Sequence, residues 1–397
     1  MTKNVYNGGE KAKMAQIQGE TRMNQHWAAA WGVGVSSKKA MLCQYAKDMT
    51  LRYYLKMFVS GEKIRLHFSN FFGEDAALLS RVTVMPRGKK EEMQEVLFAG
   101  KNQGEIPAHG ELDSDPLSFP VEAGMEIAVS LYFSECTPLS TGVTCSGPHC
   151  QGGYAKGDHC ADNELTFGDS VEMSYYFLLN RLDVYTDEKV KTLIAFGDSI
   201  TSQSWPDWLM DRLSEKGRKD LAIVRSAISG NRVLREYQNL QHIDYGPTGV
   251  ERFEKEISIP GADRVIVLEG VNDIIHPDGI HPYRPWAHLP TAEELIEGLR
   301  TYIRIAHAHG LKIYLCTITA IGGWRTDAEN RQEIRRKVNE WILGGGEADG
   351  VIDFAAAVAD PENPIALLPE YDSGDHLHPS VEGAKRMVGS IPEDFLA

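Results

Sequence analysis

The hydrophobic pattern of the chain changes near Asp187 and Glu188, and this change constrains the fold more than any other feature. Between about residues 50 and 186, short segments rich in β-branched and aromatic residues are separated by turn residues. No strongly amphipathic helix interrupts them, so the pattern favours an all-β sandwich of antiparallel strands. The strands that we expect cover residues 53–59, 63–68, 81–85, 125–133 and 171–179.

The second half alternates short apolar segments with helices. Strands are expected at 193–196, 221–224, 265–268, 313–317 and 351–354, where continuous apolar runs are typical of buried parallel strands. Helix signals lie between them. Pro206 sits near the first turn of one helix and Gly217 follows its end, and capping-box patterns begin at Thr291 and Thr326. This alternation predicts an α/β fold with a flavodoxin-like, doubly wound, parallel five-stranded sheet.

These patterns divide the chain into two domains. Residues 1–186 form the expected β-sandwich domain, and its first 25 residues lack a clear period and are interpreted as a loose arm. Residues 187–397 form the expected catalytic domain. In open α/β sheets, ligands bind at the carboxyl ends of the strands. Polar segments follow the expected strands at 197–201, 229–231 and 270–273, and another lies at 375–379, past a longer loop.

The residues of these segments suit acyl transfer by a serine. Ser199 follows a glycine turn between a strand and a helix, where its hydroxyl is exposed, but a serine hydroxyl needs an adjacent base. His378 suits the base, and Asp375 suits the carboxylate that orients it. The backbone N–H groups of Ser199 and Gly230, with the side-chain amide of Asn272, suit an oxyanion hole.

The same segments resemble the SGNH (GDSL-like) hydrolase family. Gly-Asp-Ser, a later glycine, Gly-x-Asn-Asp and Asp-x-x-His-Pro occur in the order of that family's blocks. The resemblance implies that Ser199, Gly230, Asn272 and His378 match its four name-giving residues. It also implies that Asp375 is the third member of the catalytic triad.

Longer phrases are similar to a bacterial subgroup of that family that carries an N-terminal β domain. These phrases cover residues 63–73, 205–207, 229–232 and 372–379. The resemblance implies activities such as those of arylesterases, acylhydrolases and xylan-associated esterases. The chain departs from the subgroup at 201–204, where related sequences often carry a longer insert, so one wall of the cleft is expected to be short.

Three of the proposed site residues also have a structural interpretation. Gly230 suits a tight turn, Asn272 a helix cap and Asp375 a loop-ordering carboxylate. His376 competes with His378 for the role of the base. The three-residue step from Asp375 to His378 fits a loop that returns both side chains to one point, which favours His378.

Aromatic residues leave two further alternatives. Trp205 and Trp324 suit either core packing, which we favour, or the lining of a substrate pocket. The sandwich domain is either a structural companion or a carbohydrate-binding module. The second alternative rests on its aromatic residues, Trp27, Trp31, Phe71, Phe72 and Tyr154.

Charge and composition limit the classes of partner that the chain can bind. The chain has 41 Lys and Arg against 56 Asp and Glu, a formal net charge of −15. This charge argues against nucleic acid and anionic membranes as partners and fits a small-molecule or oligosaccharide ester substrate.

No segment has the roughly 18 apolar residues that span a bilayer. Residues 1–23 lack the apolar core of a signal peptide, so a cytoplasmic location is expected. The oligomeric state is left open.

Four of the six cysteines lie between Cys136 and Cys160, near His149 and His159. Their spacing lacks the paired Cys-x-x-Cys pattern of most structural zinc sites, so we favour reduced thiols and expect no metal and no cofactor.

The sequence therefore predicts a serine esterase that hydrolyses short, acetyl-type esters through an acyl-enzyme, with a carbohydrate as the expected alcohol half. The nearest alternative is a broader arylesterase, thioesterase or lysophospholipase with the same triad. A catalytically silent sugar-binding protein is the alternative from another class.

Overall fold

The computed structural model describes residues 25–37, 44–165, 171–172, 175–237, 242–282, 284–345 and 347–397. Nearly all of the expected N-terminal arm, and Cys43, lie outside these residues. Within the described part of the chain, no helix combines the length and apolar character needed to cross a bilayer.

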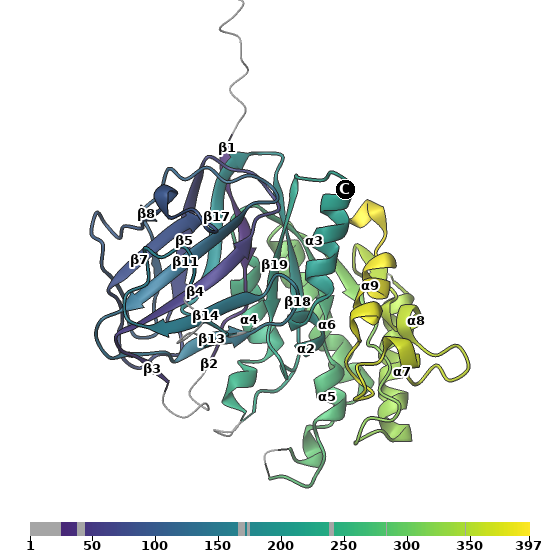
Figure 1. Ribbon diagram of the computed structural model, residues 1–397. Helices are drawn as coiled ribbons and strands as arrows, with labels where there is room; N and C mark the ends of the chain where they lie inside the picture. The colour runs from purple at the N-terminus through teal and green to yellow at the C-terminus, as the bar shows by residue number, and fades with distance from the viewer. Residues whose placement is uncertain are drawn as a thin grey trace, which may run out of the picture.

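The N-terminal half is a sandwich of two antiparallel sheets, as predicted (Figure 1). One sheet has the order β1-β17-β5-β10, with bounds Gln25–Gly32, Leu179–Asp187, Lys63–Ser69 and Glu111–Asp113. The other has the order β15-β14-β4-β11-β7-β8, with bounds Val171–Glu172, Gln151–Lys156, Met49–Lys56, Glu126–Phe133, Arg81–Pro86 and Gln94–Glu95. Apolar side chains from both sheets share one core.

Smaller antiparallel groups close the edges of the sandwich. They are β12-β3, β16-β13-β2 and β6-β9. Their bounds are Thr137–Pro138, Tyr45–Ala46, Tyr175–Phe177, Thr141–Thr144, Ser36–Ser37, Ala77–Leu79 and Gly104–Ile106.

The sequence prediction differs from the structure at two strands of the sandwich. The single strand expected over 171–179 is wrong: this region contains β15, β16 and the start of β17, and Leu178 has a left-handed backbone with φ of 63°. The sequence analysis also missed β1. This strand is alanine-rich and lies between β17 and the parallel sheet, so it lacks the alternating pattern of a strand with one exposed face.

The C-terminal half is the predicted parallel sheet, in the order β19-β18-β20-β21-β22. The five strands are Leu221–Ala227, Lys191–Gly197, Ala262–Leu268, Lys312–Cys316 and Gly350–Ile352. All five expected strands are present, and their order is that of a flavodoxin-like fold.

Helices cover both faces of this sheet (Figure 1). Helices α3 (Trp205–Glu215), α8 (Phe354–Val358) and α9 (Val381–Gly389) pack together on one face. Helices α4 (Gly249–Ile257), α6 (Ala292–Ala308) and α7 (Glu329–Leu343) cover the other. Two short helices, α2 (Ser199–Ser202) and α5 (Val271–Ile275), begin just after strands.

The helix caps only partly match the sequence pattern. The capping box at Thr291 and Glu294 is present at the start of α6. The one expected at Thr326 is wrong, because α7 has Ala328 at its N-cap and the Thr326 hydroxyl donates to the carbonyl of Ile275. A further capping box, which the sequence analysis did not identify, joins Thr248 and Glu251 at the start of α4.

The two halves meet where the chain after β1 runs beside β19. Val33 forms a parallel bridge with Arg225. The Thr192 hydroxyl donates to the carbonyl of Ala29 at 2.8 Å. Glycines permit this close approach, since a Cβ on Gly34 would lie 2.9 Å from the carbonyl oxygen of Ala227.

An aromatic cluster attaches α4 and α6 to the parallel sheet. The ring of Phe253 lies edge-on to that of Phe196, with centroids 4.9 Å apart. It also lies 4.5 Å from the ring of Tyr302, and all three side chains are buried. Helix α4 is thereby fixed next to the end of β18, where the polar segments converge.

We expect Phe253→Ala to lower the free energy of unfolding by about 3–5 kcal/mol, because it removes a fully buried ring and leaves a cavity. Urea unfolding followed by circular dichroism measures this change. The control is Leu343→Ala, since Leu343 is 52% exposed and its truncation should change stability little. Equal effects of the two substitutions would contradict the role assigned to the cluster.

Candidate active site

Ser199 begins helix α2 directly after β18. The buried side chain of Asp198 caps this helix by accepting a hydrogen bond from the backbone N–H of Ile200 at 3.0 Å. Asp198 thus stabilises the turn before the helix. Ser199 itself is half-buried, so the turn fixes its backbone and leaves its hydroxyl accessible at the rim of the sheet.

A continuous chain of hydrogen bonds joins three predicted site residues. The Ser199 hydroxyl lies 2.8 Å from Nε2 of His378. On the other side of the ring, Nδ1 of His378 lies 2.6 Å from Oδ2 of Asp375. His376 instead bonds through Nδ1 to Asp372 at 2.8 Å, and its side chain is 58% exposed. The structure therefore places His378, the histidine that we favoured, beside the serine.

Asp375 both orders its loop and holds the imidazole. Its Oδ1 accepts from the backbone N–H groups of Leu377 at 3.0 Å and His378 at 2.8 Å, while Oδ2 contacts the ring. Burial raises the pKa of this carboxyl. The hydrogen bonds from His378 and the backbone outweigh burial and hold the pKa below its ordinary value. The carboxylate is thus charged at neutral pH and suited to orient the ring.

The backbone conformation and the close packing at position 230 require a glycine. Its φ is +81°, and a Cβ at this position would lie 2.5 Å from ring atoms of Tyr245. A side chain here would therefore strain the backbone and clash with the ring. The turn interpretation of Gly230 holds, and the preceding Ser229 lies beside α2, with its hydroxyl 2.9 Å from that of Ser202.

Asn272 lies in α5 but does not cap it, because Gly270 is the N-cap. The buried Asn272 amide donates to the carbonyl of Asn231 at 2.9 Å. An amide nitrogen carries two N–H groups, and this bond uses one of them. The neighbouring Asp273 accepts from the backbone N–H groups of Val233 and Leu234 at 2.8 and 3.0 Å, and burial raises its pKa to about 7.

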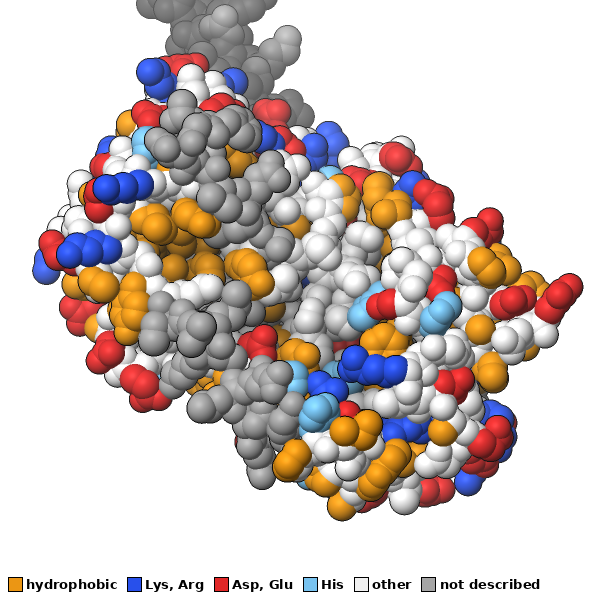
Figure 2. All heavy atoms as spheres, turned by 60° about the horizontal axis from the view of Figure 1, so that its bottom comes forward, with side chains coloured by type: hydrophobic (Ala, Val, Ile, Leu, Met, Phe, Trp, Pro, Cys, Tyr) orange, Lys and Arg blue, Asp and Glu red, His pale blue; other side chains and the backbone are white. Residues whose placement is uncertain are grey.

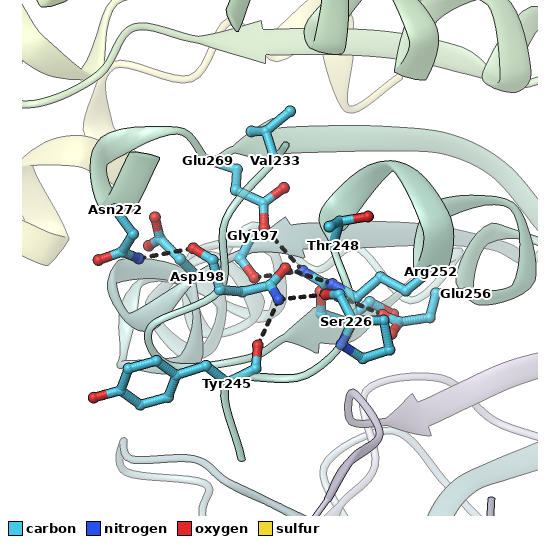
Figure 3. A network of polar contacts seen from close by, with 12 residues as sticks. Gly197, Asp198, Ser226, Val233, Tyr245, Thr248, Arg252, Glu256, Glu269 and Asn272 are labelled. Carbon is cyan, nitrogen blue, oxygen red and sulfur yellow. Dashed lines mark hydrogen bonds and ion pairs between the residues drawn. The ribbon is translucent and has the colours of Figure 1, made fainter. Parts of the chain in front are cut away.

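A buried guanidinium ties the segments together (Figure 3). Arg252, on α4, donates from Nη2 to the carbonyl of Gly197 at 2.8 Å and from Nε to Oδ1 of Asn231 at 2.8 Å. It also contacts Glu269 at 3.2 Å and Glu256 at 2.8 Å. Gly197 precedes the serine turn, Asn231 follows Gly230, and Glu269 precedes the Asn272 segment. One side chain therefore fixes the positions of three of the four segments relative to one another.

The carboxylates around Arg252 are strongly buried. Burial raises the pKa of Glu269 and of Glu256, and the positive charge of Arg252 opposes this shift. Glu269 also accepts a hydrogen bond of 2.5 Å from the hydroxyl of Tyr302. The network thus contains two buried carboxyl groups, and the positive charge of Arg252 stabilises their charged forms.

An aromatic and histidine cluster lies on the Gly230 side of the rim. Tyr237, His242, Tyr245 and His276 pack ring against ring, with His242 stacked 4.8 Å from Tyr245. Burial, aided by nearby arginines, lowers the pKa of His242 to about 4 and that of His276 well below its ordinary value, so both rings are neutral at pH 7. Figure 2 shows the face at which the strands end, with histidine side chains gathered on it.

Arg232 lies beside this cluster, with its guanidinium carbon 4.0 Å from the centroid of the Tyr237 ring. The side chain is buried, and within the described residues none of its three nitrogen atoms has a hydrogen-bond partner. A buried cation without such partners adds positive potential to its surroundings.

The surroundings of Trp205, Trp324 and two of the cysteines show which of these side chains belong to the core. Trp205 is buried and packs edge-on against Phe354 at 5.6 Å, in agreement with a core role, whereas Trp324 is only partly buried. Neither Cys145 nor Cys150 forms a disulfide, and Cys150 Sγ accepts a bond from Arg225. Across the described residues, no group of three or more His, Cys, Asp or Glu side chains is placed to hold a metal ion.

Sequence analysis missed the residues that support the site. Arg252, Glu256 and Glu269 are charged, and charged residues are normally assigned to solvent. A signal was present in α4, where Arg252 and Glu256 share the buried face of the helix with Phe253 and Ile257. Charged residues within an apolar helical stripe indicate a buried ion pair.

Comparisons with known proteins give one family and a set of distant structures. The model of the GDSL-like lipase/acylhydrolase family matches residues 195–386, which include all five predicted site residues. A GDSL-like lipase from Bacteroides thetaiotaomicron is 19% identical over 53% of this chain and 88% of its own, with a TM-score of 0.38. A catalytic mutant of an acetylxylan esterase from Geobacillus stearothermophilus is 20% identical over 52% of this chain and 94% of its own, with a TM-score of 0.39. No curated protein matches the chain significantly.

We expect Arg252→Met to lower the free energy of unfolding by about 3–5 kcal/mol at pH 8, because it leaves two buried carboxylates unpaired. A carboxyl whose pKa is raised by folding destabilises the protein as pH rises through that pKa, so the loss should be smaller at pH 5. Urea unfolding at both pH values measures it. Arg336→Met, which removes an exposed ion pair, is the control and should have little effect. A loss that does not depend on pH would contradict this electrostatic account.

Proposed function

Residues 195–386 belong to the GDSL-like lipase/acylhydrolase family, a family of ester hydrolases, and we propose that this chain is a serine esterase that removes short, acetyl-type acyl groups from carbohydrate esters. The observation that carries the proposal is the chain of hydrogen bonds from Ser199 through His378 to Asp375, with distances of 2.8 and 2.6 Å. A nucleophile, a base and an orienting carboxylate in this order define acyl transfer by a serine.

In the first half of the reaction, the Ser199 oxygen attacks the ester carbonyl and its proton passes to Nε2 of His378. Asp375, charged at neutral pH, stabilises the imidazolium that forms. His378 then gives the proton to the leaving alcohol, and the acyl group remains on Ser199. In the second half, His378 takes a proton from water, which attacks the acyl-enzyme. The bond between the acyl group and Ser199 then breaks, His378 returns the proton to the Ser199 oxygen, and the carboxylic acid leaves.

The negative oxygen of each tetrahedral intermediate needs hydrogen-bond donors. The N–H groups of Ser199 and Gly230 and the second amide N–H of Asn272 suit this role. The bond from Asn272 to the carbonyl of Asn231 fixes the amide in advance, so no reorganisation is needed when the charge develops. One such donor lowers the barrier by about 2.7–4 kcal/mol.

A short acyl group fits the walls of this rim. Only Gln203 and Ser204 connect α2 with α3, so little chain is present there to build a tunnel. On the other side, the Tyr245 ring lies close over Gly230, backed by neutral imidazoles. These polar-edged rings suit a small acyl group better than a fatty chain.

Ser199→Ala should reduce turnover of 4-nitrophenyl acetate by a factor on the order of 10⁶, because the nucleophile is lost. Ser204→Ala is the matched control, since the Ser204 side chain makes no capping bond at the start of α3. Circular dichroism checks that both variants are folded. A folded Ser199→Ala protein that keeps a tenth of the parent turnover would exclude Ser199 as the nucleophile.

His378→Ala should abolish turnover, whereas His376→Ala should leave most of it, because only His378 contacts the serine. Asp375→Asn should fall between the parent and His378→Ala, since an orienter is less essential than the base. Comparing kcat for the three variants decides the assignment. Comparable losses from the two histidine substitutions would show that His378 is not the base.

Catalytic efficiency across 4-nitrophenyl esters should peak between acetate and butyrate and fall for longer chains. A long apolar tunnel would instead add about 0.8 kcal/mol of binding for each buried methylene, so efficiency would rise with length. The series from acetate to palmitate, below micelle-forming concentrations, measures this profile. A maximum at octanoate or beyond would favour a lipase-like activity instead.

A further inference from the structure

A cavity of about 670 Å³ lies between the sandwich and helix α4. Side chains from β5, β10 and β17 form one wall, and α4 with the end of β19 forms the other. None of the five predicted site residues lines it. Its volume is typical of sites for small molecules, which often lie between two structural units.

The basic side chains that line this cavity already have carboxylate partners. Lys255 contacts Glu111 at 2.6 Å. Arg252 contacts Glu256 at 2.8 Å, and Arg181 contacts the buried Asp183 at 2.7 Å. A charged ligand would therefore have to compete with existing partners. A neutral ligand meets no such cost.

The polar groups of the wall are arranged for hydroxyls. Nδ1 of His67 donates to Oδ1 of Asn180 at 2.7 Å. Its Nε2 faces Glu111 at 3.6 Å and Asp113 at 3.9 Å, both longer than a hydrogen bond. A hydroxyl at this position can donate its hydrogen to Nε2 of His67 or to one of the carboxylates, and adjacent hydroxyls of one sugar ring can bond to the others.

An aromatic and aliphatic surface completes the cavity. Phe71 is 40% exposed and meets Phe72 edge-on at 5.1 Å. Lys255 lies 3.9 Å from the centroid of the Phe71 ring and holds it in place. Val33, Val224 and Ile259 also line the cavity. A ligand with both C–H faces and hydroxyl edges matches this combination.

We propose that this cavity is a non-catalytic binding site for a neutral oligosaccharide, built jointly by the sandwich and α4. The sugar C–H face lies on Phe71, and its hydroxyls bond to His67, Glu111 and Asp113. This assigns the sandwich a ligand-binding role that the family match does not cover, since that match begins at residue 195. The cavity is also connected to the reaction centre. Arg252 lines it and donates to the carbonyl of Gly197, two residues before Ser199 (Figure 3).

Titration calorimetry on the full chain carrying Ser199→Ala tests the site. The probes are xylotriose, cellotriose and mannotriose, with trigalacturonate as the charged counterpart. At least one neutral trisaccharide should bind with a Kd below about 10 mM and more tightly than trigalacturonate. Phe71→Ala should weaken this binding about tenfold, since the stacking surface is lost. Leu78→Ala, at a 42% exposed position of the same sandwich, should leave it unchanged.

The proposal of an oligosaccharide site is overturned if no neutral trisaccharide binds or if trigalacturonate binds best. It is also overturned if Phe71→Ala and Leu78→Ala change trisaccharide binding equally. Its failure is distinct from that of the proposed esterase activity. With Ser199 in place, Phe71→Ala should leave kcat/KM for 4-nitrophenyl acetate unchanged, because that ester does not reach the cavity. A chain that binds trisaccharides but hydrolyses no ester supports the site and contradicts the esterase proposal.

Discussion

The guanidinium of Arg252 is the interaction on which the arrangement of the rim depends. Its donors reach the carbonyl of Gly197 and the side chain of Asn231, and its charge compensates the buried Glu269. Each partner lies at or just after the end of a different strand, at the start of the segments that carry Ser199, Gly230 and Asn272. Loops at the end of a sheet are otherwise free to move independently, whereas acyl transfer tolerates only small errors in position. Burying a charge costs free energy, but the directional hydrogen bonds of the guanidinium fix several backbone segments at once.

Helix α4 gives this side chain its position and joins the two halves of the molecule. Phe253 packs the helix on the sheet beside Phe196, and Lys255 on the same helix contacts Glu111 of the sandwich. The sandwich is also attached through the chain after β1, where Val33 pairs with Arg225 next to the parallel sheet. The sandwich thus supplies one wall of a shared cavity, and α4 connects that wall with the turn before the nucleophile.

The sequence predicted the parts of the fold that follow from repeated local patterns. Continuous apolar runs located all five parallel strands, and the segments after them contain Ser199 and His378, which the structure brings within 2.8 Å. Their catalytic roles, and the division at residues 186 and 187, stay predictions. Strand β1 was missed because it is buried against another sheet and shows no alternation. Glu269 was missed because a charge in a sequence does not reveal a partner folded onto it from another segment, whereas Arg252 left a signal in the buried face of α4.

Labelling with a fluorophosphonate, followed by peptide mass spectrometry, shows whether His378 activates Ser199, because this reagent reacts with serines that an adjacent base activates. We expect one phosphonyl group per chain, on the peptide that contains Ser199, and no labelling when His378 is replaced by alanine. Labelling of a different serine in a chain that hydrolyses esters, or undiminished labelling of Ser199 without His378, would contradict it.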